Sequence, residues 1–171
     1  MELSKAEFSF DYDGDDFNVV VERNSLRGCC WAPTGRTVDF VVVFVHDIGS
    51  FVTQNHDIFD VFVNHGGAVY ACDHLGHGRS QGPRLGLTIN NIIKETSAVL
   101  QYVLSQYPGV PIYLYGQEAG ALAIMSFILG KAQNWDVVSG VVLESPWLVK
   151  WVQRDVGIFE TSLLLLMDKI F

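Results

Sequence analysis

Residues 116–120 read Gly-Gln-Glu-Ala-Gly and stand between a short apolar run and a helical pattern. This is the G-x-S-x-G format of a turn that projects a nucleophile, but its centre is Glu118 where the pattern has serine. A serine in this place attacks an acyl carbon, whereas a carboxylate is a poor nucleophile toward esters. Gly116 and Gly120 supply the small residues needed where the strand and helix backbones approach closely. The sequence therefore predicts a normally built turn that lacks its attacking hydroxyl.

Hydrophobic patterning predicts the elements that position this turn. Apolar or β-branched runs predict strands at 26–31, 38–45, 68–72, 112–115 and 138–143. Helical spacing predicts helices around 58–63, over 89–107 with Thr88 as N-cap, and over 119–129. Strands that alternate with helices indicate an α/β fold, a mostly parallel sheet with helices on both faces. The loops after Val45, Cys72 and Tyr115 then share the carboxyl edge of that sheet, where functional loops gather.

The N-terminal region predicts a hairpin or bend. Residues 6–12 and 18–22 alternate or run apolar on either side of the acidic residues 13–16. The acidic residues do not fit a calcium loop, because the glycine and glutamate that an EF-hand requires are missing from its sixth and twelfth positions. We expect a solvated turn there.

Four stretches in register carry a resemblance to a known family. They are residues 46–49 (His-Asp-Ile-Gly), 73–80 (Asp-His-Leu-Gly-His-Gly-Arg-Ser), 107–116 and 140–146. In order and spacing they resemble the α/β-hydrolase superfamily, and within it the monoglyceride lipase and lysophospholipase branch, also grouped as serine aminopeptidase S33. The stretch 73–80 is the most specific of the four.

The resemblance implies hydrolysis of glycerolipid carboxylic esters by a serine acyl-enzyme mechanism, with no cofactor or metal. It places the backbone donors of an oxyanion hole at Ile48 and Ala119. The residues that match the family's two loop motifs are His46, Asp73, Gly76, His77 and Gly78.

The chain departs from the family pattern in three places. Glu118 replaces the nucleophile, Asp47 replaces a glycine of the oxyanion loop, and no residue matches the triad aspartate and histidine, which follow the nucleophile in chain order. Loss of the nucleophile alone costs a serine hydrolase on the order of 10⁶ in turnover. We hypothesise that the Glu118 carboxylate accepts from the N–H groups of Ala119 and Ile48 and so blocks the hole itself.

The remaining polar residues have plain structural interpretations. His46, His74 and His77 precede the turn, and loop hydrogen bonding explains them better than metal ligation or catalysis, since zinc-type partners are missing. Ser80, Ser126 and Ser145 lie outside the turn and are interpreted as structural.

Composition limits the function classes. The chain of 171 residues has a net charge of -8, which disfavours nucleic-acid binding. Its three cysteines predict reduced thiols, and without a signal peptide or a membrane-spanning run they predict a cytoplasmic protein. Peripheral membrane contact is open, because the apolar cluster 163–167 has the character of a lipid-facing cap helix.

The expected organisation is the N-terminal part of a hydrolase core over residues 1–146, followed by the start of a helical cap over 147–171. The strand 138–143 would then form a sheet edge open to a protein partner or to a copy of the chain. The preferred interpretation is a catalytically inactive pseudoenzyme that binds lipid, acylglycerol or protein. Two alternatives stay open: an ester hydrolase completed by a second chain, and a product without function.

Overall fold

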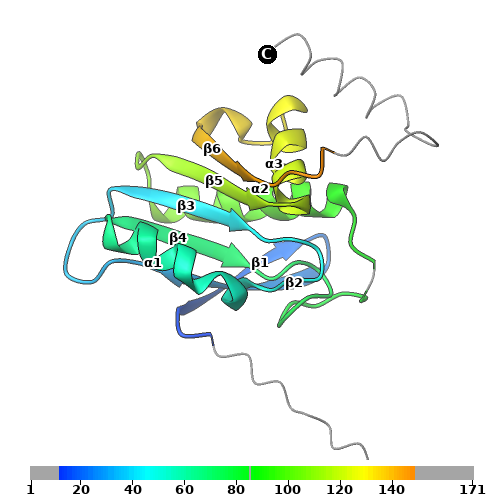
Figure 1. Cartoon of the computed structure of the whole chain (residues 1–171), viewed down its shortest axis with the longest axis horizontal. Coiled ribbons are helices and arrows are strands. Elements are labelled where there is room, and N and C mark those ends of the chain that lie inside the picture. Colours follow the sequence, from blue (N-terminus) through cyan, green and yellow to red (C-terminus); the bar gives the residue numbers. More distant parts are fainter. Residues whose placement is uncertain (1–11, 85, 149–171) are drawn as a thin grey trace, which may run out of the picture.

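The computed structural model describes residues 12–84 and 86–148. One six-stranded sheet runs through the molecule in the order β1-β2-β4-β3-β5-β6 (Figure 1). Its strands are β1 (Asp15–Val21), β2 (Asn24–Trp31), β3 (Phe40–Val45), β4 (Gly67–Cys72), β5 (Ile112–Gln117) and β6 (Val138–Glu144). The helices are η1 (Val52–Asn55), α1 (His56–Asn64), α2 (Ile89–Gln106), α3 (Ala119–Leu129) and η2 (Trp135–Val137).

Four strands of the sheet are parallel. β3 pairs in parallel with β4 on one side and β5 on the other, and β5 pairs in parallel with β6. β2 joins the sheet antiparallel to β4, and β1 is antiparallel to β2. The predicted α/β architecture with a mostly parallel sheet is confirmed.

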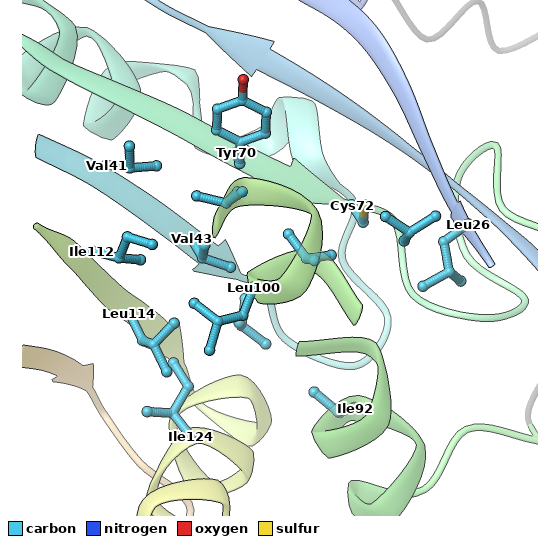
Figure 2. Close-up of a cluster of buried hydrophobic side chains, with 14 of the residues drawn as sticks. Leu26, Val41, Val43, Tyr70, Cys72, Ile92, Leu100, Ile112, Leu114 and Ile124 are labelled. Carbon is cyan, nitrogen blue, oxygen red and sulfur yellow. The ribbon is translucent and has the colours of Figure 1, made fainter. Parts of the chain in front are cut away.

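The sheet is covered on both faces, which explains why its central strands are apolar throughout. α2 and α3 lie against one face, and α1 lies against the other (Figure 1). Side chains from alternate strand positions meet α2 and α3 in the larger core (Figure 2). The labelled members of that core are Leu26, Val41, Val43, Tyr70, Cys72, Ile92, Leu100, Ile112, Leu114 and Ile124.

A smaller core lies under α1. Phe59 on that helix is fully buried and contacts the rings of Phe44 and Trp31 at centroid distances of 4.9 and 4.7 Å. Alternating side chains of β3 therefore serve two cores, Val43 facing α2 and Phe44 facing α1.

Helix α2 begins as predicted. The hydroxyl of Thr88 accepts from the backbone N–H of Asn91 at 3.2 Å, and the Asn91 side chain accepts from the Thr88 N–H at 3.0 Å. This reciprocal cap satisfies donors that the first turn would otherwise leave open.

The predicted hairpin or bend at residues 13–16 is present only as a bend at Gly14. Asp15 and Asp16 belong to β1, and the chain reverses between Val21 and Asn24, where Glu22 has a φ of 57°. Asp15 and Asp16 can occupy a strand because β1 is an edge, where both residues are exposed and Asp16 forms an ion pair with Arg79 at 2.7 Å. Residues 6–11 lie outside the described residues. Of the tail predicted to be helical over 147–171, residues 147 and 148 are described and are not helical, and the rest lies outside the described residues.

Strand β6 forms the other edge of the described sheet, with β5 as its neighbour. Val141 and Val142 on it are 43% and 47% exposed. The predicted open edge at 138–143 is thus present among the described residues. A partner at that edge stays a prediction.

Candidate active site

The turn between β5 and α3 is built as a nucleophile elbow. Glu118 is the single residue between the strand and the helix, with φ 47° and ψ −107°. Such a conformation is costly for a side chain other than glycine, and packing on both sides must hold it. Strain of this kind at a strand-to-helix turn is what projects the central side chain outward.

Both glycines of the elbow stand where a side chain does not fit. A Cβ added to Gly116 would lie 2.7 Å from the backbone of Ala121, and one added to Gly120 would lie 2.2 Å from the carbonyl oxygen of Val45. The close approach of α3 to β5 and β3 therefore needs hydrogen at both positions. Because β3 continues directly into the loop that holds His46, this packing also sets the distance between the elbow and that loop.

Asp47 engages one of the two backbone donors predicted for the oxyanion hole. The Asp47 Oδ1 atom accepts from the backbone N–H of Ala119 at 3.0 Å. The hypothesis that Glu118 fills the hole is therefore wrong. A carboxylate does occupy it, but it comes from the loop after β3.

The side chain of Glu118 is exposed and turns toward the segment after β6. Its Oε2 atom accepts from the indole Nε1 of Trp147 at 3.1 Å, and its backbone N–H donates to the carbonyl of Glu144 at 2.9 Å. The longer side chain of Glu118 thus reaches past the hole, while the shorter Asp47 folds over its own loop.

Burial raises the pKa of Asp47 above its usual value of 3.8, and the neighbouring Glu118 carboxylate raises it further. The hydrogen bond from Ala119 and the neighbouring N–H of Ile48 lower this pKa, because both favour the charged form. The site therefore holds two carboxyl groups side by side at the N-terminus of α3, and it favours proton uptake by Asp47.

This gives a stability prediction for Asp47→Asn. A raised pKa means that the folded state holds the proton more tightly than the unfolded state, so this contribution to stability falls as pH rises through the folded pKa. At pH 7 the neutral Asp47→Asn variant should unfold at a higher temperature than the wild type. The advantage should shrink as the pH is lowered through the raised pKa of Asp47, because the wild-type carboxyl then becomes neutral in the fold as well.

Thermal unfolding of wild type and variant between pH 4 and 7.5 measures the effect. The matched control is Asp60→Asn, which removes the same charge from an exposed position on α1 and should change stability by less than about 0.5 kcal/mol. An Asp47→Asn variant that is less stable than wild type at pH 7 would contradict the interpretation.

The loop after β4 is organised around one buried carboxylate. Asp73 is fully buried and accepts from the N–H of Val52 at 3.0 Å, from the N–H of Arg79 at 2.9 Å and from the hydroxyl of Tyr12. The hydroxyl of Ser80 donates to the Asp73 carbonyl at 2.5 Å. Asp73 therefore ties together the N-terminal segment, the start of η1 and its own loop.

The glycines of this loop allow the chain to wrap around Asp73. Gly78 has a φ of 44°, and a Cβ there would lie 2.1 Å from the Asp73 carboxylate. Gly76 has a φ of 73°, and a Cβ there would lie 2.3 Å from the carbonyl oxygen of Pro83. Both positions need glycine for conformation as well as for space.

The loop histidines are fixed by their partners. His46 is fully buried, its Nε2 accepts from the backbone N–H of His74, and its Nδ1 faces the carbonyl of Asp47 at 2.7 Å. His77 accepts from the N–H of Gly49 through Nε2 and faces the carbonyl of Leu75 through Nδ1. These partners require neutral rings with the proton on Nδ1. Burial lowers the pKa of His46 well below its usual value, in agreement with that assignment.

His74 joins the cluster to α2. Its Nε2 faces the carbonyl of His46 at 2.9 Å, so this nitrogen must carry a proton, and its Nδ1 lies 2.6 Å from Glu95 Oε2. The other oxygen of Glu95 accepts from the N–H of Leu75. This buried, hydrogen-bonded pair of His74 and Glu95 thus holds the loop after β4 against the helix.

The structure places the sequence-predicted residues as follows. His46, Ile48, Asp73, Gly76, His77, Gly78, Gly116, Glu118, Ala119 and Gly120 all lie at the carboxyl edge of the sheet or in the loops that leave it. The five histidines of the chain all fall within the described residues, and none of them hydrogen-bonds to Glu118. A relay from a histidine to the elbow tip is not formed in this part of the chain.

Sequence reasoning missed three contacts of the site. They are the hole contact of Asp47, the pairing of Glu95 with His74 and the indole of Trp147 on Glu118. Glu95 did carry a signal, since it stands on the apolar face of α2 beside Ile92 and Val99. A carboxylate on a buried helix face needs a partner.

Neither metal nor thiol chemistry is supported in the described part of the chain. No group of three or more histidine, cysteine, aspartate or glutamate side chains in residues 12–84 and 86–148 could hold a metal ion. The three cysteines are buried free thiols, and burial raises the pKa of Cys30 to about 11 and that of Cys29 to about 12. They remain protonated and unreactive at neutral pH.

Comparison with known proteins identifies the family. The chain matches the family described as serine aminopeptidase S33 over residues 36–171. The chain belongs to this family. It is 32% identical over 120 residues to a monoglyceride lipase homolog of Monkeypox virus and, over the same length, to the monoglyceride lipase of Homo sapiens. Each match covers 68% of this chain, but 41% of the viral protein and 37% of the human one.

Solved structures agree on the fold. A soluble variant of monoglyceride lipase from Saccharomyces cerevisiae, in complex with a substrate analog, superimposes with a TM-score of 0.71 at 13% identity. The superposition covers 81% of this chain and 46% of the yeast chain. The chain thus spans less than half the length of the family members it matches, and its core is that of an α/β-hydrolase of the monoglyceride lipase-like branch.

Among the residues that the structure describes, none of the helices is both long and apolar enough to cross a bilayer.

Proposed function

We propose that this chain is a catalytically inert member of the monoglyceride lipase-like branch, whose remaining role is to bind an acylglycerol or a related lipid. The observation that carries the proposal is Glu118. It is an exposed carboxylate at the tip of a strained elbow, where the family pattern has a serine nucleophile. A carboxylate attack would produce an anhydride, and no histidine in the described residues reaches Glu118 to activate water.

Support for a binding role comes from the surface beside the elbow. Trp147 and Leu148 are each 43% exposed, and the Trp147 indole contacts Glu118 directly. An apolar surface next to a polar tip suits a ligand that has both an acyl chain and a glycerol head.

Binding can be tested with a monoalkylglycerol ether, which has no ester to cleave. We expect saturable quenching or enhancement of tryptophan fluorescence that is lost in Trp147→Phe, because Trp147 stands beside the proposed site. The other tryptophans remain in that variant and control for changes remote from the elbow. A wild-type signal unchanged by the ether up to its solubility limit would reject the binding role.

The second candidate is an ester hydrolase completed by another chain. Two observations favour this candidate. The chain covers 41% and 37% of the length of two relatives, and no residue in it matches the triad acid or histidine. It requires chemistry at Glu118. Turnover that appears only when a complementing chain is added, and that is lost in Glu118→Gln, would favour this candidate over the inert one.

A further inference from the structure

One backbone donor of the predicted oxyanion hole already has an acceptor. An oxygen that occupied the hole would take hydrogen bonds from the N–H groups of Ala119 and Ile48, and the Asp47 carboxylate already takes the one from Ala119 at 3.0 Å. The family pattern has glycine at position 47, and glycine has no side chain that could accept a hydrogen bond. The carboxylate is present because Asp47 departs from the pattern. The departure at 47 and that at 118 are therefore two separate changes to the site.

We propose that Asp47 is an internal occupant of the oxyanion hole, which closes the hole to carbonyl and carboxylate oxygens from outside. The inference deepens the proposed function and rests on it, because it assumes that the bound lipid lies beside the elbow. It adds that the acyl carbonyl of a bound lipid does not reach the hole. A serine at 118 would face the same obstruction.

Connectivity favours the internal group over an external one. Asp47 directly precedes Ile48, so its carboxylate folds back on its own loop and meets the donors without any loss of translational freedom. A fatty-acid carboxylate would have to displace Asp47 from the Ala119 N–H, and it would lose the entropy of association in doing so. The Glu118 carboxylate beside the hole adds repulsion against any anion.

The test uses the full chain labelled with ¹⁵N, with octanoate as the probe and Glu118→Gln as the common background. The background removes the second charge while leaving an oxygen that can accept from Trp147. Adding Asp47→Gly to this background opens the hole, whereas adding Asp47→Asn removes the charge of Asp47 and leaves an acceptor oxygen in place. The readout is the backbone amide shift of Ala119 and Ile48 as octanoate is added.

We expect saturable shifts of both amides in the double variant that carries Asp47→Gly. We expect none in Glu118→Gln alone or in the double variant that carries Asp47→Asn. Equal shifts in Glu118→Gln with Asp47 intact would overturn the proposal, because the hole would be open. A folded Asp47→Gly double variant that shows no shift would overturn it as well. If only the Asp47→Asn double variant responds, charge rather than occupancy closes the site, and the proposal is again wrong.

A second measurement needs only variants that keep the size of the side chain. In the wild type, the Ala119 and Ile48 amides should titrate together with the carboxyl carbon of Asp47, and this common step should persist in Glu118→Gln and vanish in Asp47→Asn. An Ala119 amide that ignores the ionisation of Asp47 would overturn the proposal even if the variants with Asp47→Gly do not fold. Neither measurement involves turnover, so failure here is distinguishable from failure of the proposed loss of catalysis.

Discussion

Replacing Gly120 with alanine is expected to lower the free energy of unfolding by about 3 kcal/mol or more. Alanine is the better helix former and would by itself gain about 1 kcal/mol in α3. The clash outweighs this gain, because the new Cβ would lie 2.2 Å from the Val45 carbonyl oxygen and 2.8 Å from that of His46. Both atoms belong to backbone, so neither can rotate away, and α3 must shift from β3.

Urea unfolding measures this change, with Gly109→Ala as the control. Gly109 has a positive φ, of 81°, but a Cβ there meets nothing within 4 Å. The control should therefore lose only the backbone preference, about 1–2 kcal/mol. A Gly120→Ala variant as stable as wild type would mean that α3 does not pack on β3 as closely as the structure has it.

Replacing Asp73 with alanine is expected to cost about 3–5 kcal/mol. The change leaves the buried N–H group of Val52 and the partly buried N–H group of Arg79 without their acceptor, and it releases the hydroxyl of Tyr12. Each buried donor left without a partner costs about 1–3 kcal/mol. The loss should also loosen residues 73–80, which the amide exchange rates of that loop would reveal.

Asp73→Asn provides the comparison, because it keeps the volume and one acceptor oxygen. We expect it to lose about half as much stability as the alanine variant. Equal losses in the two variants would indicate that hydrogen bonding to the second carboxylate oxygen, rather than volume, is what Asp73 contributes.

The architecture was largely predictable from the sequence. The period of 3.6 in α2 and the continuous apolar run of β3 are strong local signals, and both elements form where the pattern places them. The position of the N-terminal chain reversal was not predictable, because Asp15 and Asp16 have turn-like character and yet lie in an edge strand. Strand position in the sheet, which depends on distant pairing, overrides such local preferences.

The residues of the candidate site were predictable from the sequence, but the contacts between their side chains were not. The sequence predicts a carboxylate in the oxyanion hole and assigns it to Glu118, whereas in the structure Asp47 is the residue that accepts from Ala119. Which of them does so depends on side-chain length and on the Trp147 indole, which lies 29 residues after Glu118 and draws its carboxylate away. Contacts of this kind arise from the folded arrangement of three loops, for which local patterns carry no information.

The most direct test of the central claim is an assay of monoacylglycerol hydrolysis by the purified chain. Release of free fatty acid is measured at pH 7. The claim is that a correctly formed elbow holds a carboxylate that does not attack. It predicts product formation equal to the buffer blank for wild type and for Glu118→Gln alike. Steady fatty-acid release by the wild type that disappears in Glu118→Gln would contradict it.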